Sequence, residues 1–342
     1  MNFKTILSPM QGVTDLPFRR LCRELSGGGA RFVSEFLSTD GSTFLTKINL
    51  RALRFDNEEK PFCVQLFGIF PQKLADAAVQ VEEFGADFIE LNAGCPVPKV
   101  ARKGGGAGLL LNLPNLKNIL KTMKAAVKVP LFLKCRIGWD ENSICIDEVL
   151  KIAEGEGVSQ LTIHGRTRVQ GYKGLANWNI IGEIASKAKI PVIGNGDINS
   201  VESALRAVQS YGVAGVAIGR GALHNPWLLG EIACEQRRKI SVKEVCSAVL
   251  RYAELMREDG LNEGQTLGKL KQFSARLCKS FEPSVSEFRL QLLRTNNYEE
   301  FLQIWLKFRD VCDTSQIRFN PDRLQNLNGQ TIDELEFGKQ FR

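Results

Sequence analysis

The chain has 342 residues, with a hydrophobic content of 44%, a charged content of 24% and a formal net charge of +7. This length can hold one large domain with its own core and a smaller second domain, and a modest positive charge suggests an anionic partner. No apolar run approaches the roughly 20 residues that a membrane span requires, and no signal-peptide pattern opens the chain, so we expect a cytoplasmic protein without a membrane partner.

Cysteine and histidine usage argues against disulfides and metal sites. Nine cysteines are scattered along the chain without C-x-x-C spacing, and there are only two histidines, His164 and His224. An odd number of scattered cysteines in a chain of ordinary length predicts reduced thiols, with neither a disulfide framework nor a zinc site. We therefore expect no metal.

Eight short apolar segments alternate with helical patterns over residues 1–240, the first expected domain. They are 6–10, 31–36, 62–68, 88–92, 131–137, 160–164, 191–195 and 215–219. Between them, segments such as Pro71–Phe84 place apolar residues three and four apart, as amphipathic helices do. This pattern predicts a (β/α)8 TIM barrel, with a doubly wound sheet as the alternative.

Cys95 stands just past one predicted strand. The short apolar run Phe88–Asn92 predicts that strand, and Cys95 follows it between Gly94 and Pro96, ahead of a basic, glycine-rich segment over 99–108. Loops at the C-terminal ends of parallel strands carry the chemistry of α/β enzymes. This position favours a reactive thiol, and a small buried hydrophobic residue is the alternative interpretation.

Polar or glycine-rich residues follow the other predicted strands as well, and in a barrel these positions meet at one mouth. They are Pro9–Gly12, Gln65, Asn92, Lys134 with Arg136, His164–Arg166, Asn195–Asp197 and Gly219–Gly221. The last two follow strands seven and eight, where barrels commonly bind a phosphate on backbone N–H groups. Arg220 would add charge-assisted hydrogen bonds, whereas the alternative is that the glycines only permit tight turns.

Three single residues near these strand ends are further candidates. Lys134 lies inside an otherwise apolar run, so it needs a negative or electron-rich partner or loses its proton. A reduced flavin would serve, and a barrel carboxylate is the alternative partner. His164 ends a predicted strand, which favours a site residue over a core histidine, and Tyr172 in the next loop could stack on a base.

The alternation of strands and helices stops near residue 240. Residues 241–311 are helical in pattern and predict a C-terminal all-helical domain. The segment 268–279 has basic residues and no acidic one, and Lys269 and Arg276 fall on one helix face. Such a face can hold a phosphate backbone, and a solvated helix surface is the alternative. Residues 312–342 are expected to form a polar tail.

Taken together, these motifs resemble the tRNA-dihydrouridine synthases, flavin enzymes that reduce a specific uridine of tRNA. The resemblance covers residues 5–306 and rests on several motifs in a shared order. They are Ser8-Pro9-Met10 with Gly12-Val13-Thr14-Asp15, Val64-Gln65-Leu66 with Gly68, Leu91–Pro96, Lys134 with Arg136–Trp139, His164–Thr167, Asn195–Ile198 and Gly219–Ala222.

The resemblance implies an FMN-binding barrel and a tRNA-binding helical domain. The residues implied to surround FMN are Pro9, Met10, Gln11, Gln65, Lys134, His164, Asn195, Gly196, Asp197, Gly219 and Arg220. Cys95 matches the family's proton donor, while Asn92 and Tyr172 match positions that hold the uracil. The residues implied to bind tRNA are Lys269, Lys271 and Arg276.

The implied reaction reduces the C5–C6 double bond of a D-loop uridine to 5,6-dihydrouridine. NADPH reduces the flavin, flavin N5 passes a hydride to uridine C6, and Cys95 protonates C5 from the other face. A thiol suits this step because an ordinary cysteine pKa of about 8.5 keeps it protonated at neutral pH yet able to release the proton. The base must leave its RNA context to reach a barrel mouth.

Within the family, the run 165–172 and the basic helix are most similar to the bacterial branch that acts at uridine 16. Ser38 stands where that branch has a tRNA-binding arginine. Two other functions stay open. One is an FMN barrel oxidoreductase of a free small molecule, similar to dihydroorotate dehydrogenases, and the other is a non-catalytic RNA-binding protein. We expect a monomer.

Overall fold

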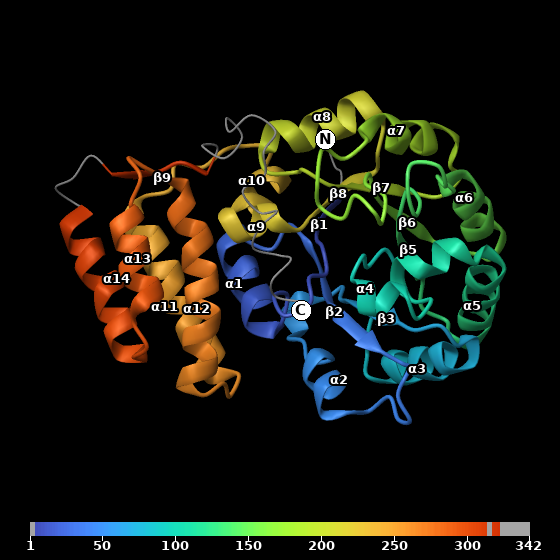
Figure 1. Cartoon of the computed structure of the whole chain (residues 1–342), viewed down its shortest axis with the longest axis horizontal. Helices are drawn as coiled ribbons and strands as arrows, with labels where there is room; N and C mark the ends of the chain where they lie inside the picture. Colours follow the sequence, from blue (N-terminus) through green and yellow to red (C-terminus); the bar gives the residue numbers. More distant parts are fainter. Residues whose placement is uncertain (1–3, 313–316, 322–342) are drawn as a thin grey trace.

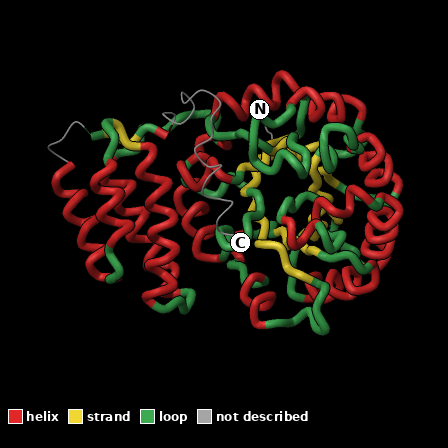
Figure 2. Tube along the Cα trace, in the orientation of Figure 1, coloured by secondary structure: helices red, strands yellow, loops and turns green. Residues whose placement is uncertain are grey.

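A computed structural model gives the structure of the chain and describes residues 4–312 and 317–321. Within these residues, eight parallel strands close into a barrel in chain order, with β1 paired to both β2 and β8. They are β1 Lys4–Leu7, β2 Arg31–Ser38, β3 Cys63–Phe67, β4 Phe88–Ala93, β5 Leu131–Arg136, β6 Gln160–His164, β7 Val192–Asn195 and β8 Gly215–Ile218. The predicted (β/α)8 barrel is confirmed (Figures 1 and 2).

Helices surround the barrel, and α3, α5, α6, α7 and α8 form most of its outer ring (Figure 1). The helices of this part are α1 Leu16–Ser26, α2 Lys47–Ala52, α3 Pro71–Glu83, α4 Pro98–Ala101, α5 Leu113–Ala126, α6 Ile146–Gly155, α7 Trp178–Lys187, α8 Val201–Tyr211, α9 Arg220–His224 and α10 Leu228–Ala233. Each long helix buries one apolar stripe, as Leu74, Ala78 and Val81 of α3 illustrate.

Alternation along the strands sorts the barrel interior into layers. Near the N-terminal ends of the strands, an apolar cluster contains Cys63, Phe132 and Ile193, with Phe88 packed against it. Side chains two residues further along a strand point into the barrel again. The residues that follow these four in that way are Gln65, Lys134, Asn195 and Glu90. A layer of polar side chains therefore lies between this apolar cluster and the C-terminal mouth of the barrel.

Four helices follow the barrel and stack beside it (Figure 1). They are α11 Val242–Glu258, α12 Glu263–Leu277, α13 Ser286–Arg294 and α14 Tyr298–Cys312. The ring of Phe18 in α1 meets Tyr252 of α11 and Phe273 of α12 edge-on, with ring centroids 5.9 and 6.0 Å apart. One hydrophobic cluster therefore extends from the barrel into this helical region.

The helical region also contains a short antiparallel ribbon that the sequence did not predict. In it, β9 Phe281–Glu282 pairs with β10 Arg318–Phe319. Strands of two residues leave no periodic pattern to read. β10 belongs to the segment expected as a polar tail, of which 313–316 and 322–342 lie outside the described residues. In the described ranges, no helix is long and apolar enough to cross a membrane.

Candidate active site

Cys95 lies in the loop between β4 and α4, and its side chain is partly exposed. The Oδ1 atom of Asn92 accepts hydrogen bonds from the backbone N–H groups of Gly94 at 3.0 Å and Cys95 at 2.9 Å. The Nε atom of Arg136 donates to the Gly94 carbonyl at 2.8 Å. At Gly106, with a φ of 53°, a Cβ atom would lie 2.9 Å from Cys95 Cβ. The backbone that carries the thiol is therefore fixed on several sides.

A chain of buried hydrogen bonds supports Asn92 from inside the barrel. Gln65 Nε2 donates to Glu90 Oε1 at 2.7 Å, and Gln65 Oε1 accepts from Asn92 Nδ2 at 2.8 Å. Gln65 is 0% exposed and Asn92 is 8% exposed. The resemblance implied contacts of Gln65 with flavin and of Asn92 with uracil. The structure adds that both side chains hold the Cys95 loop in place.

Lys134 and Asn195 meet at the mouth. Lys134 Nζ donates to Asn195 Oδ1 at 3.1 Å, and Asn195 Nδ2 donates to the Ala217 carbonyl at 2.7 Å. Burial lowers the pKa of Lys134, while the Glu90 carboxylate acts in the opposite direction. The hydrogen-bond partner of the ammonium is thus a neutral amide, and the cation suits an anionic ligand.

Arg136 was expected at the mouth together with Lys134, but the sequence analysis gave it no role of its own. It is 1% exposed, and its Nη1 atom donates to the carbonyls of Thr167 and Gly171, each at 2.8 Å. Burial lowers the pKa of Arg136 to about 10. This guanidinium therefore ties the Cys95 loop to the loop that carries Tyr172. Its sequence signal is its inward position, two residues after Lys134.

Arg166 was expected at the mouth without a role of its own, and it shapes the same end of the barrel. Its Nη2 atom donates to both carboxylate oxygens of Asp197, at 2.7 and 2.9 Å, and to the Gly174 carbonyl at 2.6 Å. The backbone N–H of Ala176 also donates a hydrogen bond to Asp197 Oδ2, at 2.8 Å. The loops after β6 and β7 are thereby joined through an ion pair between the buried Arg166 and the partly buried Asp197.

His164 is buried among cations. Burial lowers its pKa well below the ordinary value, and the charges of Arg136 and Lys134 lower the pKa further. Its Nε2 atom lies 3.4 Å from Arg166 Nη1. Because a guanidinium only donates, Nε2 is the acceptor and we infer that the neutral ring carries its proton on Nδ1. The Tyr172 ring lies 6.4 Å from the His164 ring, centroid to centroid.

The two glycine-rich turns after β7 and β8 lie close to each other. Gly196 has a φ of 121°, and a Cβ atom there would lie 2.6 Å from Ala176 Cβ, so this position requires glycine. Arg220 Nη2 lies 3.6 Å from Asp197 Oδ1. A Cβ atom on Gly219 would lie 3.5 Å from Met10 Sδ, which brings the first and eighth strand ends together.

Gln11 supplies an open hydrogen-bonding position beside these turns. Its Oε1 atom is buried and has no hydrogen-bond partner among the described residues. Buried polar atoms are normally satisfied, so such an acceptor indicates a ligand that donates. A flavin fits, because its ring carries an N–H donor, its reduced ring takes negative charge near Lys134, and its phosphate suits the glycine-rich turns.

The basic residues of α12 are not brought together on one surface. Lys269 Nζ lies 2.9 Å from Asp15 Oδ2, and Lys271 Nζ donates to Asn296 Oδ1 at 3.2 Å. Arg276 is only 6% exposed, so it lies on the buried side of the helix rather than on the predicted basic face. Helical spacing gives the angle of each side chain around α12, but packing covers only part of that face: Arg276 is buried and Lys269 is partly buried.

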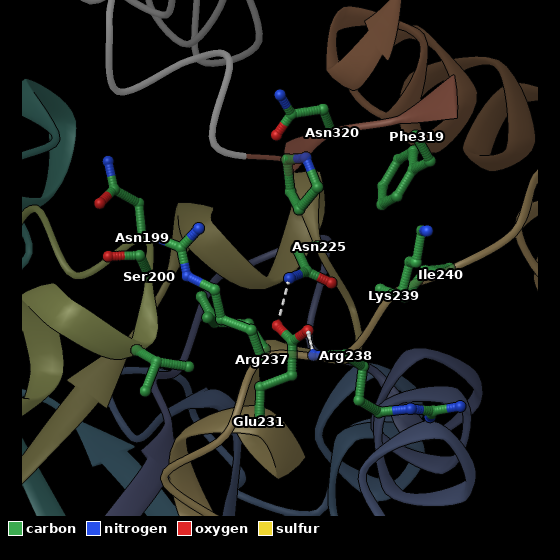
Figure 3. A pocket seen from close by; sticks show the side chains of 13 residues that line it. Asn199, Ser200, Asn225, Glu231, Arg237, Arg238, Lys239, Ile240, Phe319 and Asn320 are labelled. Atoms are coloured by element: carbon green, nitrogen blue, oxygen red, sulfur yellow. Dashed lines mark hydrogen bonds between the residues drawn. The ribbon is translucent and has the colours of Figure 1, made fainter. Parts of the chain in front are cut away.

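A separate cavity of about 290 Å³ lies where the barrel meets the helical region (Figure 3). Its lining includes Glu231, Arg237 and Arg238 but not Cys95. Arg237 pairs with Glu202 at 2.5 Å and Arg238 with Glu244 at 3.0 Å. Because carboxylates of the chain neutralise these arginines, we assign the chemistry to the barrel mouth.

The cysteines and the other potential metal ligands of the described residues show neither a disulfide nor a metal-binding group. Every cysteine whose side chain is described is a free thiol. In residues 4–312 and 317–321, no group of three or more His, Cys, Asp or Glu side chains is arranged to hold a metal ion. Among these free thiols, Cys95 is partly exposed.

Comparison with known proteins gives consistent matches along the chain. The family profile described as "Dihydrouridine synthase (Dus)" matches residues 6–312. A probable tRNA-dihydrouridine synthase 1 of Synechocystis is 36% identical over 305 residues, which cover 88% of this chain and 84% of that protein. A tRNA-dihydrouridine synthase B of Xanthomonas campestris is 41% identical over 230 residues, 67% of this chain and 69% of its own length. The solved structure of histamine dehydrogenase from Rhizobium shares the fold, with a TM-score of 0.51 and 12% identity over 74% of this chain and 49% of its own.

Proposed function

The chain belongs to the dihydrouridine synthase family, and from that premise we propose that it reduces a uridine of tRNA to 5,6-dihydrouridine as a flavin-dependent oxidoreductase. The observation that supports this proposal is the set of side chains at the mouth of the barrel. Three features meet there: the thiol of Cys95 on a fixed loop, the buried acceptor of Gln11 that has no hydrogen-bond partner among the described residues, and the cationic side chain of Lys134. An RNA substrate and an anionic cofactor both suit such a mouth.

FMN is the proposed cofactor, and NADPH is the proposed reductant. When bound, FMN supplies the hydride that C6 of the uridine receives. The residues proposed to hold it are Pro9, Met10, Gln11, Gln65, Lys134, His164, Asn195, Gly196, Asp197, Gly219 and Arg220. Among them, Lys134 would stabilise negative charge on the ring and the turns at Gly196 and Gly219 would bind the phosphate.

Cys95 is proposed to donate the proton to C5 of the uridine. As the new C5–H bond forms, the S–H bond breaks and the sulfur keeps the electron pair. Burial raises the pKa of the Cys95 thiol, while the Val97 N–H and then the charges of Arg136 and Lys134 act in the opposite direction. Burial keeps the thiol protonated at neutral pH, and the same cations stabilise the thiolate that remains.

The substrate is proposed to be uridine 16 in the D-loop, with the uracil held by Asn92 and Tyr172. The similarity of the run 165–172 to the branch that acts at this position supports the choice. Ser38 stands where that branch has a tRNA-binding arginine, so the position is tested directly by a dihydrouridine map. Lys271 is the basic residue of α12 best placed to contact tRNA. We propose that the enzyme works as a monomer in the cytoplasm.

An assay with purified full-length protein tests this function. The protein is incubated with FMN, NADPH and tRNA that lacks dihydrouridine, and the RNA is analysed by mass spectrometry. We expect dihydrouridine to form with the wild type and with Cys145→Ala, a second partly buried thiol, but not with Cys95→Ala. Turnover of free dihydroorotate or orotate with unchanged tRNA would contradict the proposal and favour a small-molecule oxidoreductase.

A further inference from the structure

The turn between β1 and α1 is held from two directions at Gly12. The backbone N–H groups of Val13 and Thr14 both donate to the Met10 carbonyl at 3.0 Å. Gly12 lies inside this turn, directly before Val13, with a φ of 77°. The N–H of Gly12 donates to a carboxylate oxygen of Glu35 in β2. The carbonyl of the same residue accepts a hydrogen bond from Lys269 Nζ at 2.8 Å. The backbone N–H and the carbonyl of Gly12 are thus each hydrogen-bonded to an ionisable side chain, Glu35 and Lys269 respectively.

Lys269 belongs to α12, so one of these two contacts crosses from the helical region to the barrel. The same Nζ atom lies 2.9 Å from Asp15 Oδ2. Asp15 is also the N-cap of α1, where its Oδ1 atom accepts from the Phe18 N–H at 3.3 Å. The side chains of Lys269 and Asp15 are 24% and 10% exposed, which shelters the pair from solvent screening more than a surface ion pair.

The turn that Lys269 holds carries two residues of the proposed flavin site. Met10 and Gln11 directly precede Gly12 in the chain. The Sδ atom of Met10 lies beside Gly219, and the Oε1 atom of Gln11 is the buried acceptor without a partner. A rotation of the turn would change the direction of that acceptor. The hydrogen bonds of Gly12 therefore help to set the orientation of the Met10 and Gln11 side chains at the mouth.

We propose that Lys269 is a positioning residue of the flavin site rather than a tRNA contact. By holding the carbonyl of Gly12 and the carboxylate of Asp15, it fixes the turn that presents Gln11 to the cofactor. The helical region then supports cofactor binding as well as substrate binding. This inference rests on the proposed flavin site, and it reassigns a lysine that the family resemblance placed on the tRNA side.

Retention of FMN by the full-length holoprotein tests this role. Lys269→Met is compared with Lys271→Met, which removes the same charge from the same helix but loses a contact to Asn296. On dilution, release of FMN is followed by the rise of its fluorescence, and the visible spectrum of the bound flavin is recorded. We expect about tenfold weaker FMN retention and an altered spectrum for Lys269→Met, because a charge-assisted hydrogen bond and an ion pair are lost. Lys271→Met should match the wild type in both readouts.

Two further variants separate positioning from general stability. Lys269→Arg keeps the charge and should recover most of the FMN affinity and the wild-type spectrum. Asp15→Asn keeps the N-cap acceptor but removes the ion pair, so it tests the same contact should Lys269→Met fail to accumulate. We expect Asp15→Asn to weaken FMN retention several-fold. A variant that combines Lys269→Met with Asp15→Asn should retain FMN only slightly less well than Lys269→Met alone.

The outcomes distinguish this inference from the proposed function. A wild-type protein that binds no FMN would overturn the flavin site itself. A wild-type protein that binds FMN, with equal FMN retention in Lys269→Met and Lys271→Met, would overturn only the positioning role. Asp15→Asn with wild-type FMN retention would do the same.

Discussion

At the Cys95 thiol, burial and the neighbouring donors act on the pKa in opposite directions. Burial has the larger effect, so the pKa lies above its ordinary value, although Arg136 and Lys134 favour the thiolate. The side chain thus stays a proton donor at neutral pH without being inert. The fully buried thiols of Cys22 and Cys135 lack access to a mouth, and burial raises the pKa of each well beyond its ordinary range.

The pH dependence of turnover follows from this shift. A proton donor with a raised pKa remains protonated as pH rises, so the rate should stay level past the ordinary cysteine pKa of about 8.5 and fall only above it. Initial rates at saturating tRNA and reductant, measured from neutral to alkaline pH, check this. A fall that is complete below about pH 8 would contradict the raised pKa of Cys95.

His164 gives a prediction for stability on the acid side. Arg136, Lys134, Arg166 and Arg220 face it, and with burial they hold its pKa far below the ordinary value. Below about pH 6.5 the unfolded chain binds a proton at this residue and the folded chain does not, so its contribution to the free energy of unfolding decreases as pH falls. Unfolding in urea at pH 5.0 and 7.5 should therefore show that His164→Gln reduces the acid loss of stability. An equal loss in both proteins would contradict this prediction.

At the scale of single elements, the loop between β4 and α5 shows how a glycine supports the thiol. Gly106 begins the 3-10 helix Gly106–Leu111, and a side chain there would meet Cys95 at both its Cβ, at 2.9 Å, and its carbonyl oxygen, at 3.0 Å. The Ala107 N–H also donates to that carbonyl at 3.1 Å. The 3-10 helix thus packs directly against the backbone of the proposed proton donor.

Gly106→Ala should separate backbone strain from displacement of the thiol. Its matched control is Gly212→Ala, which has a similar φ of 64° but no atom within 4 Å of the added Cβ. Left-handed strain should cost each variant about 1–2 kcal/mol in the free energy of unfolding. Gly106→Ala alone should also lose about 10-fold to 100-fold in activity, because the reacting group moves. Equal activities of the two variants would show that the contact with Cys95 is unimportant.

The elements of the barrel could be predicted from the sequence, whereas contacts between them could not. Apolar runs placed all eight strands, and because these strands are parallel, the residues just past them lie at one end of the barrel. The hydrogen bonds from Glu90 through Gln65 to Asn92 join neighbouring strands, and their register is invisible in a single sequence. Arg276 was misplaced for a related reason. Helical spacing gives the angle of a side chain around α12 but not what packs there.

At the scale of the whole molecule, the barrel and the helical region share one hydrophobic cluster. Phe18, Tyr252 and Phe273 pack edge-on across the boundary, and Tyr252 and Phe273 lie 5.1 Å apart, centroid to centroid. Edge-to-face pairs of this kind each stabilise by about 0.5–1.5 kcal/mol beyond the area they bury. Removal of residues from 241 onward would expose this apolar surface.

This shared core predicts that the two regions unfold together. Calorimetry of the full-length protein should show one transition, with a calorimetric enthalpy close to the van't Hoff enthalpy. Phe18→Ala should lower the stability of the whole molecule by about 3–5 kcal/mol rather than uncouple its parts. Two separate transitions in the wild type would contradict a single cooperative unit.

The central claim, reduction of a tRNA uridine with Cys95 as the proton donor, is tested most directly by a dihydrouridine map. Transfer RNA from cells that lack this protein is mapped by mass spectrometry, position by position, and compared with strains complemented by the wild type or by Cys95→Ala. We predict that dihydrouridine is lost at a single D-loop position, proposed to be position 16, and that only the wild type restores it. An unchanged map in cells without another synthase for that position would contradict the account, and restoration by Cys95→Ala would remove Cys95 from its proposed role.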